Sequence, residues 1–129
     1  MPNANQELSR GQFAVCGGLG LLMVGLGLSY LIAPELIEDL YGLDIPERGK
    51  YGVHYAVGVR DLFYGLLVLT LTRLRLRRSL TIAIGLGIVL PLGDACIVLF
   101  HEKAGLLAAS PHLAGIIMLG VVFRYVKSR

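Results

Sequence analysis

The sequence predicts an all-α integral membrane protein, an antiparallel four-helix bundle with a short interfacial helix after the first span. Three observations support this fold class. Hydrophobic residues make up 55% of the 129 residues, and the mean hydropathy is +0.69. The apolar residues fall into four long runs, each near the roughly 20 residues that a helix needs to cross the hydrocarbon core. The charged residues gather in short clusters between these runs, as in polytopic membrane proteins.

The length allows a single domain, residues 1–129, and the runs predict spans at about residues 13–33, 52–72, 80–100 and 106–126. The first run leads into a Pro-Glu turn rather than a cleavage site, so we expect a retained span. In the third, Pro91 cannot donate to the carbonyl of Gly87 and predicts a kink. The last span has two candidate starts, because apolar residues begin at Ala104, whereas Ser110-Pro111 resembles an N-cap before a first-turn proline.

The connection between the first two spans begins with PELIEDLY, which predicts a short helix in the membrane interface. Pro34 suits a first helical turn. One side of this helix is apolar and the other is acidic; the apolar side consists of Leu36, Ile37, Leu40 and Tyr41. Tyrosines favour membrane interfaces, and that position is expected for Tyr30, Tyr41, Tyr51, Tyr55 and Tyr125.

The distribution of basic residues predicts the topology. RLRLRR at residues 73–78 lies between spans two and three, and the C-terminus, RYVKSR, is also basic. Basic residues concentrate on the cytoplasmic side, so both termini are expected there, with the acidic connection at 34–51 on the other side. Because the basic clusters lie at membrane boundaries, the expected partner is the lipid bilayer and no nucleic acid.

Two charged residues, Arg60 and Asp61, lie near the middle of the second run. A charged side chain at the bilayer centre costs at least about 2.5 kcal/mol on insertion scales and normally faces the bundle interior with a partner. The 3.6-residue period places His54 and Asp61 on one face of this span and Arg60 and Tyr64 on the adjoining face. The adjacent charges Arg60 and Asp61 are therefore the main indication of a functional site.

Further ionisable residues lie at similar depths in the later spans, namely Asp94 in the third and His112 in the fourth. If these faces meet, Arg60, Asp61, Asp94 and His112 bound one pocket in the outer half of the membrane, with Tyr64 able to lend a hydroxyl. The candidate acid/base residues are Asp94, His112 and Asp61, because intramembrane carboxyls and histidines often carry proton chemistry. The candidate substrate-binding residues are Arg60, Tyr64 and, at the mouth, His54.

Ordinary structural roles remain open for the same residues. Arg60 could pair with Asp94 only to hold two helices together, and Asp61 could do the same or stay protonated. His112 could be hydrogen-bonded at the interface, where His54 and His101 are also expected.

No metal and no cofactor is expected, since the histidines lack a metal-ligand spacing such as HxxxH and no haem or flavin signature occurs. Cys16 and Cys96 are expected near opposite membrane faces, too far apart for a disulfide. Small residues allow close helix packing, and Gly18, Gly25 and Ser29 share one face of the first span.

Several segments resemble small four-span proteins of the DoxX-like group, and within it an uncharacterised family, a domain of unknown function. They are SYLIAPELIEDLYGLD, GVRDLFYGLLVL, PLGDACIVLF and PHLAG. The motifs are the Arg-Asp of span two, the Gly-Asp at Gly93-Asp94 and the histidine of span four. The resemblance implies a link to oxidoreductases and quinone chemistry, and a more distant similarity to anthrone oxygenases, which oxidise flat polyketide intermediates without an evident cofactor.

Two functions follow from these observations. The first is a small membrane enzyme, such as an isomerase, cyclase or oxygenase, that acts on a lipophilic small molecule. The second is a non-enzymatic subunit, scaffold or lipid-binding protein whose buried charges only lock the helices. A transporter is a third reading, and it would need a homodimer to form a path.

Overall fold

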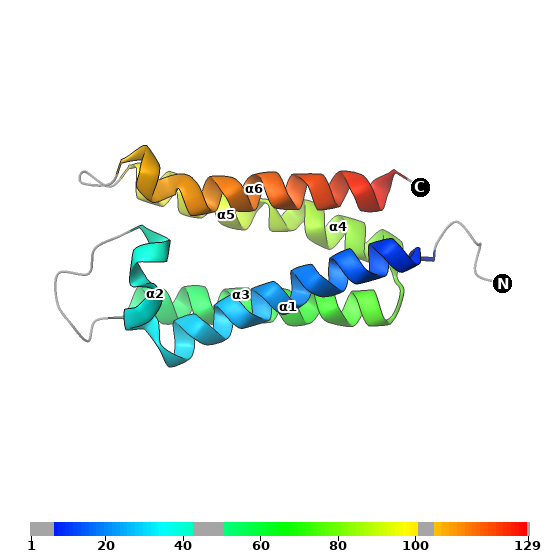
Figure 1. The fold of residues 1–129 in the computed structure, drawn as a ribbon, viewed down its shortest axis with the longest axis horizontal. Coiled ribbons are helices and arrows are strands. Elements are labelled where there is room, and N and C mark those ends of the chain that lie inside the picture. Colours follow the sequence, from blue (N-terminus) through cyan, green and yellow to red (C-terminus); the bar gives the residue numbers. More distant parts are fainter. Residues whose placement is uncertain (1–6, 43–50, 101–104, 129) are drawn as a thin grey trace.

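The computed structural model describes residues 7–42, 51–100 and 105–128. This part of the chain is helical and contains no strand. The helices are α1 (Arg10–Ile32), α2 (Pro34–Tyr41), α3 (Gly52–Arg73), α4 (Arg77–Gly87), α5 (Val89–Leu99) and α6 (Leu106–Lys127) (Figure 1). α1, α3, α4 with α5, and α6 are each long and apolar enough to cross a membrane. The predicted all-α four-helix membrane bundle is therefore confirmed.

The bundle consists of two helix pairs. α1 packs along α3, while α4 and α5 pack along α6. The helix α2 lies across one end, where it contacts α1, α3 and α6. The start of α1, the end of α6 and the turn after α3 lie at the other end (Figure 1). The basic clusters at Arg73–Arg78 and at the C-terminus thus share one end of the molecule.

The end that holds the termini is closed by hydrogen bonds. Ser9 and Gln12 form a capping box at the start of α1. The Gln12 side-chain amide also donates to the carbonyl oxygens of Tyr125 and Val126 at 3.1 and 3.3 Å, and the Nε of Arg77 donates to the Val126 carbonyl at 3.0 Å. These bonds satisfy carbonyls in the last turn of α6, which have no partner within the helix.

Four glycines allow α1 and α3 to cross in close contact. A Cβ atom on Gly27 would lie 2.5 Å from the backbone nitrogen of Leu62, and one on Gly65 would lie 2.8 Å from the carbonyl oxygen of Gly20. Gly58 faces Gly27 in the same way. Such approach of backbones is the usual role of small residues between membrane helices.

The expectation that Gly18, Gly25 and Ser29 form the packing face of α1 is wrong. Cβ atoms on Gly18 and Gly25 would meet nothing within 4 Å, and both residues are exposed. Spacing alone could not separate the two faces, because Gly20 and Gly27 repeat at the same interval of seven residues.

Replacing Gly27 with Ala should destabilise the bundle, because the new methyl group meets the backbone of α3 rather than a movable side chain. We expect a loss of about 1–3 kcal/mol, as for other overpacked interiors. Unfolding in mixed detergent, followed by circular dichroism, measures it. Gly18→Ala is the matched control and should change little, since its methyl group enters open space. Equal stability of the two variants would contradict the close crossing.

The third span is interrupted near Pro91, as predicted. α4 ends at Gly87 and α5 begins at Val89, with Pro91 in the first turn of α5. The missing N–H of Pro91 leaves the Gly87 carbonyl without its usual helical donor. The Tyr64 ring packs directly against Gly87, in the space that a Cβ atom would fill.

The fourth span begins at Leu106, after Gly105, so the alternative start at Pro111 is wrong. Pro111 lies inside α6 and removes the bond that would reach the Leu107 carbonyl. The Ser110 hydroxyl donates to that same carbonyl at 2.7 Å. Ser110 therefore does not cap a helix but replaces the donor that the proline lacks.

Candidate functional site

The site is built around the guanidinium group of Arg60, which lies between two carboxylates. Its Nη1 and Nη2 atoms donate to Oδ1 and Oδ2 of Asp94, both at 2.8 Å. Its Nε and Nη2 atoms donate to Oδ1 of Asp61, at 3.0 and 2.9 Å. Asp61 and Asp94 are each only 5% exposed. α3 and α5 are thus joined by a bidentate charge-assisted pair, the strong geometry for arginine and carboxylate.

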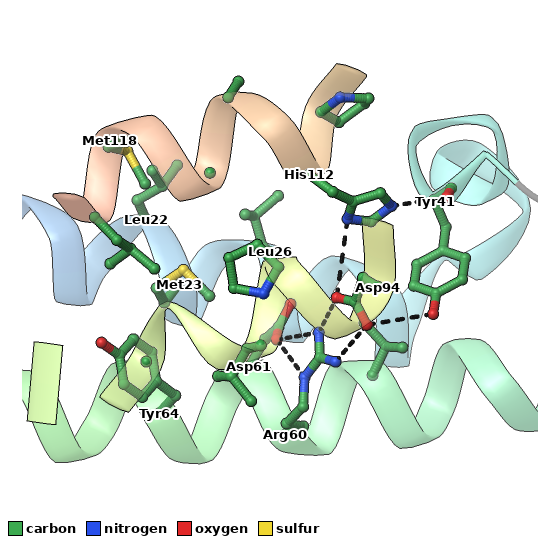
Figure 2. A pocket seen from close by; sticks show the side chains of 18 of the residues that line it. Leu22, Met23, Leu26, Tyr41, Arg60, Asp61, Tyr64, Asp94, His112 and Met118 are labelled. Carbon is green, nitrogen blue, oxygen red and sulfur yellow. Dashed lines mark hydrogen bonds and ion pairs between the residues drawn. The ribbon is translucent and has the colours of Figure 1, made fainter. Parts of the chain in front are cut away.

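His112 on α6 extends the cluster. Its Nε2 atom lies 2.9 Å from the backbone oxygen of Tyr41, and its Nδ1 atom lies 3.8 Å from Oδ2 of Asp94 (Figure 2). A carbonyl oxygen can only accept a hydrogen bond, so Nε2 carries a proton. Nδ1 is therefore the ring nitrogen left without a hydrogen bond, and it faces Oδ2 of Asp94.

Tyr41, at the end of α2, is the residue of the site that the sequence prediction missed. Its hydroxyl donates to Oδ1 of Asp94 at 3.4 Å, and its ring packs edge-on against His112. Burial, followed by the neighbouring Asp94 carboxylate, raises the pKa of Tyr41 to about 12, so the hydroxyl stays a donor at neutral pH. The amphipathic pattern of PELIEDLY did place Tyr41 on the apolar side, which faces the bundle at this position.

Two features bring α2 to this point. Gly42 has a φ of 83°, a left-handed conformation that favours glycine, and it ends the helix. A Cβ atom at Gly42 would clash with the backbone of Ala108, so glycine also lets α2 lie against the start of α6.

The expected interfacial positions of Tyr30 and Tyr41 are wrong, because both side chains are buried.

A cavity of about 390 Å³ lies next to the cluster and is mostly apolar. Its size falls within the range of small-molecule sites, and a few convergent polar groups in an apolar cavity are typical of them. The charged residues, His112 and Tyr41 lie together on one side, and Tyr64 lies apart from them (Figure 2). The lining residues from α1 and α6 include Leu22, Met23, Leu26, Ala114, Gly115 and Met118.

The remaining predicted site residues lie as follows. Tyr64 lines the cavity, but its hydroxyl donates to the Ala83 carbonyl at 3.3 Å. His54 does not line the cavity, and it is 1% exposed rather than interfacial. Its ring lies among those of Tyr30, Tyr41 and Tyr51, and neither ring nitrogen has a hydrogen-bond partner within the described part of the chain. The predicted interfacial position of His101 and the alternative span start at Ala104 concern residues outside the part of the chain that the structure describes.

Within the described ranges, no three His, Cys, Asp or Glu side chains are grouped to hold a metal ion. Cys16 is buried and Cys96 exposed, and both are free thiols. The groups available for chemistry are therefore the carboxylates, the guanidinium, the imidazole and the tyrosine hydroxyls.

These features define a small four-span integral membrane protein with a buried ionic cluster beside an apolar cavity. Its sequence matches the model of a domain of unknown function, DUF4267, over residues 20–125, and the chain belongs to this family. No curated protein and no solved structure matches it.

Proposed function

We propose that this protein is a membrane enzyme that binds a lipophilic small molecule in the cavity and moves a proton at the Asp94–His112 couple. The observation that carries the proposal is the position of the ionic cluster, which lines a mostly apolar cavity. If the cluster only held the helices together, we would expect close packing around it and no adjacent cavity, because the interiors of membrane proteins pack closely.

The couple has the parts that proton transfer needs. Asp94 and His112 come from different helices, α5 and α6, and Nδ1 faces Oδ2 across 3.8 Å. Arg60 and the Tyr41 hydroxyl hold the carboxylate in place, while the Tyr41 carbonyl holds the ring. General acid–base catalysis by such positioned groups contributes about 10²–10⁴ in rate.

The resemblance to the DoxX-like group and, more distantly, to anthrone oxygenases supports a flat or ring-containing lipophile as the molecule concerned. The basic clusters support cytoplasmic termini, because both lie at the end opposite α2 (Figure 1). The cavity would then open toward the other leaflet.

One observation favours a second function, that of a non-enzymatic scaffold or lipid-binding subunit. The bidentate bond between the partly buried Arg60 and the buried Asp94 satisfies most of what the two charges require. In that case the cluster only fixes the register of α3 against α5.

Blocking the cavity distinguishes bound lipophile from lipid that adheres to the outside. Ala114 lines the cavity from α6 and is itself exposed, so a Phe ring at this position narrows the open side of the cavity. In Ala114→Phe we expect the amount of copurifying lipophile to fall at least about tenfold, the equivalent of about 1.4 kcal/mol. Mass spectrometry of extracts from the purified protein measures it.

The matched control is Ile117→Phe, one turn further along α6, where the side chain is 68% exposed and does not line the cavity. This variant should keep the lipophile. If both variants retain the same molecules in the same amounts, the cavity does not bind a lipophile and the proposal fails.

A further inference from the structure

One carboxylate oxygen of the cluster accepts no hydrogen bond within the described part of the chain, and it belongs to a residue that lines the cavity. Arg60 donates twice to Oδ1 of Asp61, whereas Oδ2 of Asp61 has no hydrogen bond from any residue that the structure describes. Asp61 lines the cavity and is 5% exposed. Figure 2 shows its second oxygen turned away from Arg60. Oδ2 is not among the fully buried polar atoms that lack a partner, so it is accessible from the cavity and can accept a hydrogen bond from a molecule there.

Arg60 itself has little capacity left for a ligand. A guanidinium has five N–H donors, and four hydrogen bonds already join Arg60 to Asp61 and Asp94. Arg60, expected from the sequence to bind the substrate, therefore has one N–H left for it and no donor pair for a carboxylate. An added anion would also meet two carboxylates at close range.

The charges of the cluster set a further limit. Arg60 contributes +1 and the two aspartates −2, which leaves −1 when His112 is neutral. With Nε2 donating to Tyr41, a neutral ring would present the lone pair of Nδ1 to Asp94. The net negative charge disfavours an anionic head group, and the guanidinium of Arg60, which lies 2.9 Å from the other oxygen of Asp61, disfavours a cationic one at Oδ2. The other titratable groups lining the cavity are the tyrosines Tyr30, Tyr41 and Tyr64, which add no charge at neutral pH.

We propose that the ligand is an uncharged lipophile with a hydroxyl head group, an alcohol, phenol or enol, that donates its hydrogen bond to Oδ2 of Asp61. The apolar part of the ligand lies against Leu22 and Met118, between α1 and α6. Leu22 is 46% exposed, so the cavity reaches the side of the bundle that acyl chains cover. This inference rests on the proposed function and names its substrate class.

The test compares four ligands of equal chain length: 1-dodecanol, dodecyl methyl ether, dodecanoate and dodecylamine. Equimolar pairs are offered to the purified protein in detergent, and bound ligand is counted by native mass spectrometry. The alcohol should exceed the ether by about tenfold, because the ether cannot donate and a hydrogen bond to a buried charged acceptor has at least that effect. Dodecanoate should bind less than the alcohol.

Asp61→Asn is the matched variant. In this variant Arg60 keeps its two hydrogen bonds to Asp94 and can also donate to the side-chain oxygen of the asparagine. The ratio of alcohol to ether should fall toward one in this variant. Differences in partitioning into detergent cancel, since both proteins meet the same mixture. Ala114→Phe should lose all four ligands.

The outcomes separate this inference from the proposed function. If Ala114→Phe abolishes binding but the wild type holds alcohol and ether equally, the cavity binds lipophiles and the head-group assignment is wrong. Preference for dodecanoate or dodecylamine overturns the uncharged head group. If no ligand depends on residue 114, the proposed function itself fails.

Discussion

Replacing Arg60 with Met should reduce the stability of the folded protein by about 3–5 kcal/mol, the usual effect of removing one partner of a buried ion pair. The methionine is of similar length but leaves Asp61 and Asp94 without their shared cation. Each carboxylate is 5% exposed and would lose both of the hydrogen bonds that it accepts from the guanidinium. The two negative charges would also repel each other across the space that the guanidinium occupied.

Reversible unfolding in mixed detergent measures this loss. The control is Arg78→Met, since Arg78 is exposed near the start of α4 and should tolerate the change. A second variant, Arg60→Met with Asp94→Leu, removes the bidentate pair as a unit and should recover part of the loss. Unchanged stability of Arg60→Met would show that the guanidinium does not hold α3 against α5.

Replacing Asp94 with Asn should abolish most turnover of the copurifying lipophile, by about 10²–10⁴, while affecting stability much less than Arg60→Met. The amide keeps the size of the side chain but cannot take a proton from Nδ1 of His112. The change does not leave Arg60 uncompensated, because Arg60 retains its ion pair with Asp61 at 2.9 Å.

Product formation and detergent unfolding are measured on the same preparations, with Glu35→Gln on the exposed side of α2 as the matched control. Loss of turnover with stability retained is the signature of an enzyme. A loss of stability as large as that of Arg60→Met would instead assign Asp94 a structural role. A variant that is both stable and active would exclude both roles for Asp94.

The fold was predictable because hydropathy and length nearly determine a membrane helix, and four such runs leave few arrangements for so short a chain. The convergence of Arg60, Asp61, Asp94 and His112 was also predictable, since membrane charges must find partners inside the bundle. Their chemical roles are not settled by this argument, because an interhelical lock and a catalytic cluster need the same residues.

Other features depended on tertiary contacts that no local pattern records. Tyr41 was assigned to the interface, because a tyrosine beside a membrane usually anchors there, yet the tilt of α2 turns it onto Asp94. His54 has the spacing of a cavity residue but is enclosed by tyrosine rings. The start of α6 was ambiguous because Ser110-Pro111 can begin a helix or, as here, occur within one.

The adjacency of Arg60 and Asp61 bears on how the protein is made. Asp94 and His112 lie in later helices, so neither is available when α3 first enters the bilayer during synthesis. Asp61 is one residue away and hydrogen-bonded to the guanidinium, so the nascent hairpin of α1 and α3 carries its own counterion. We infer that Asp61 allows this helix to insert before its long-range partner exists, and that arrival of the third span then completes the neutralisation.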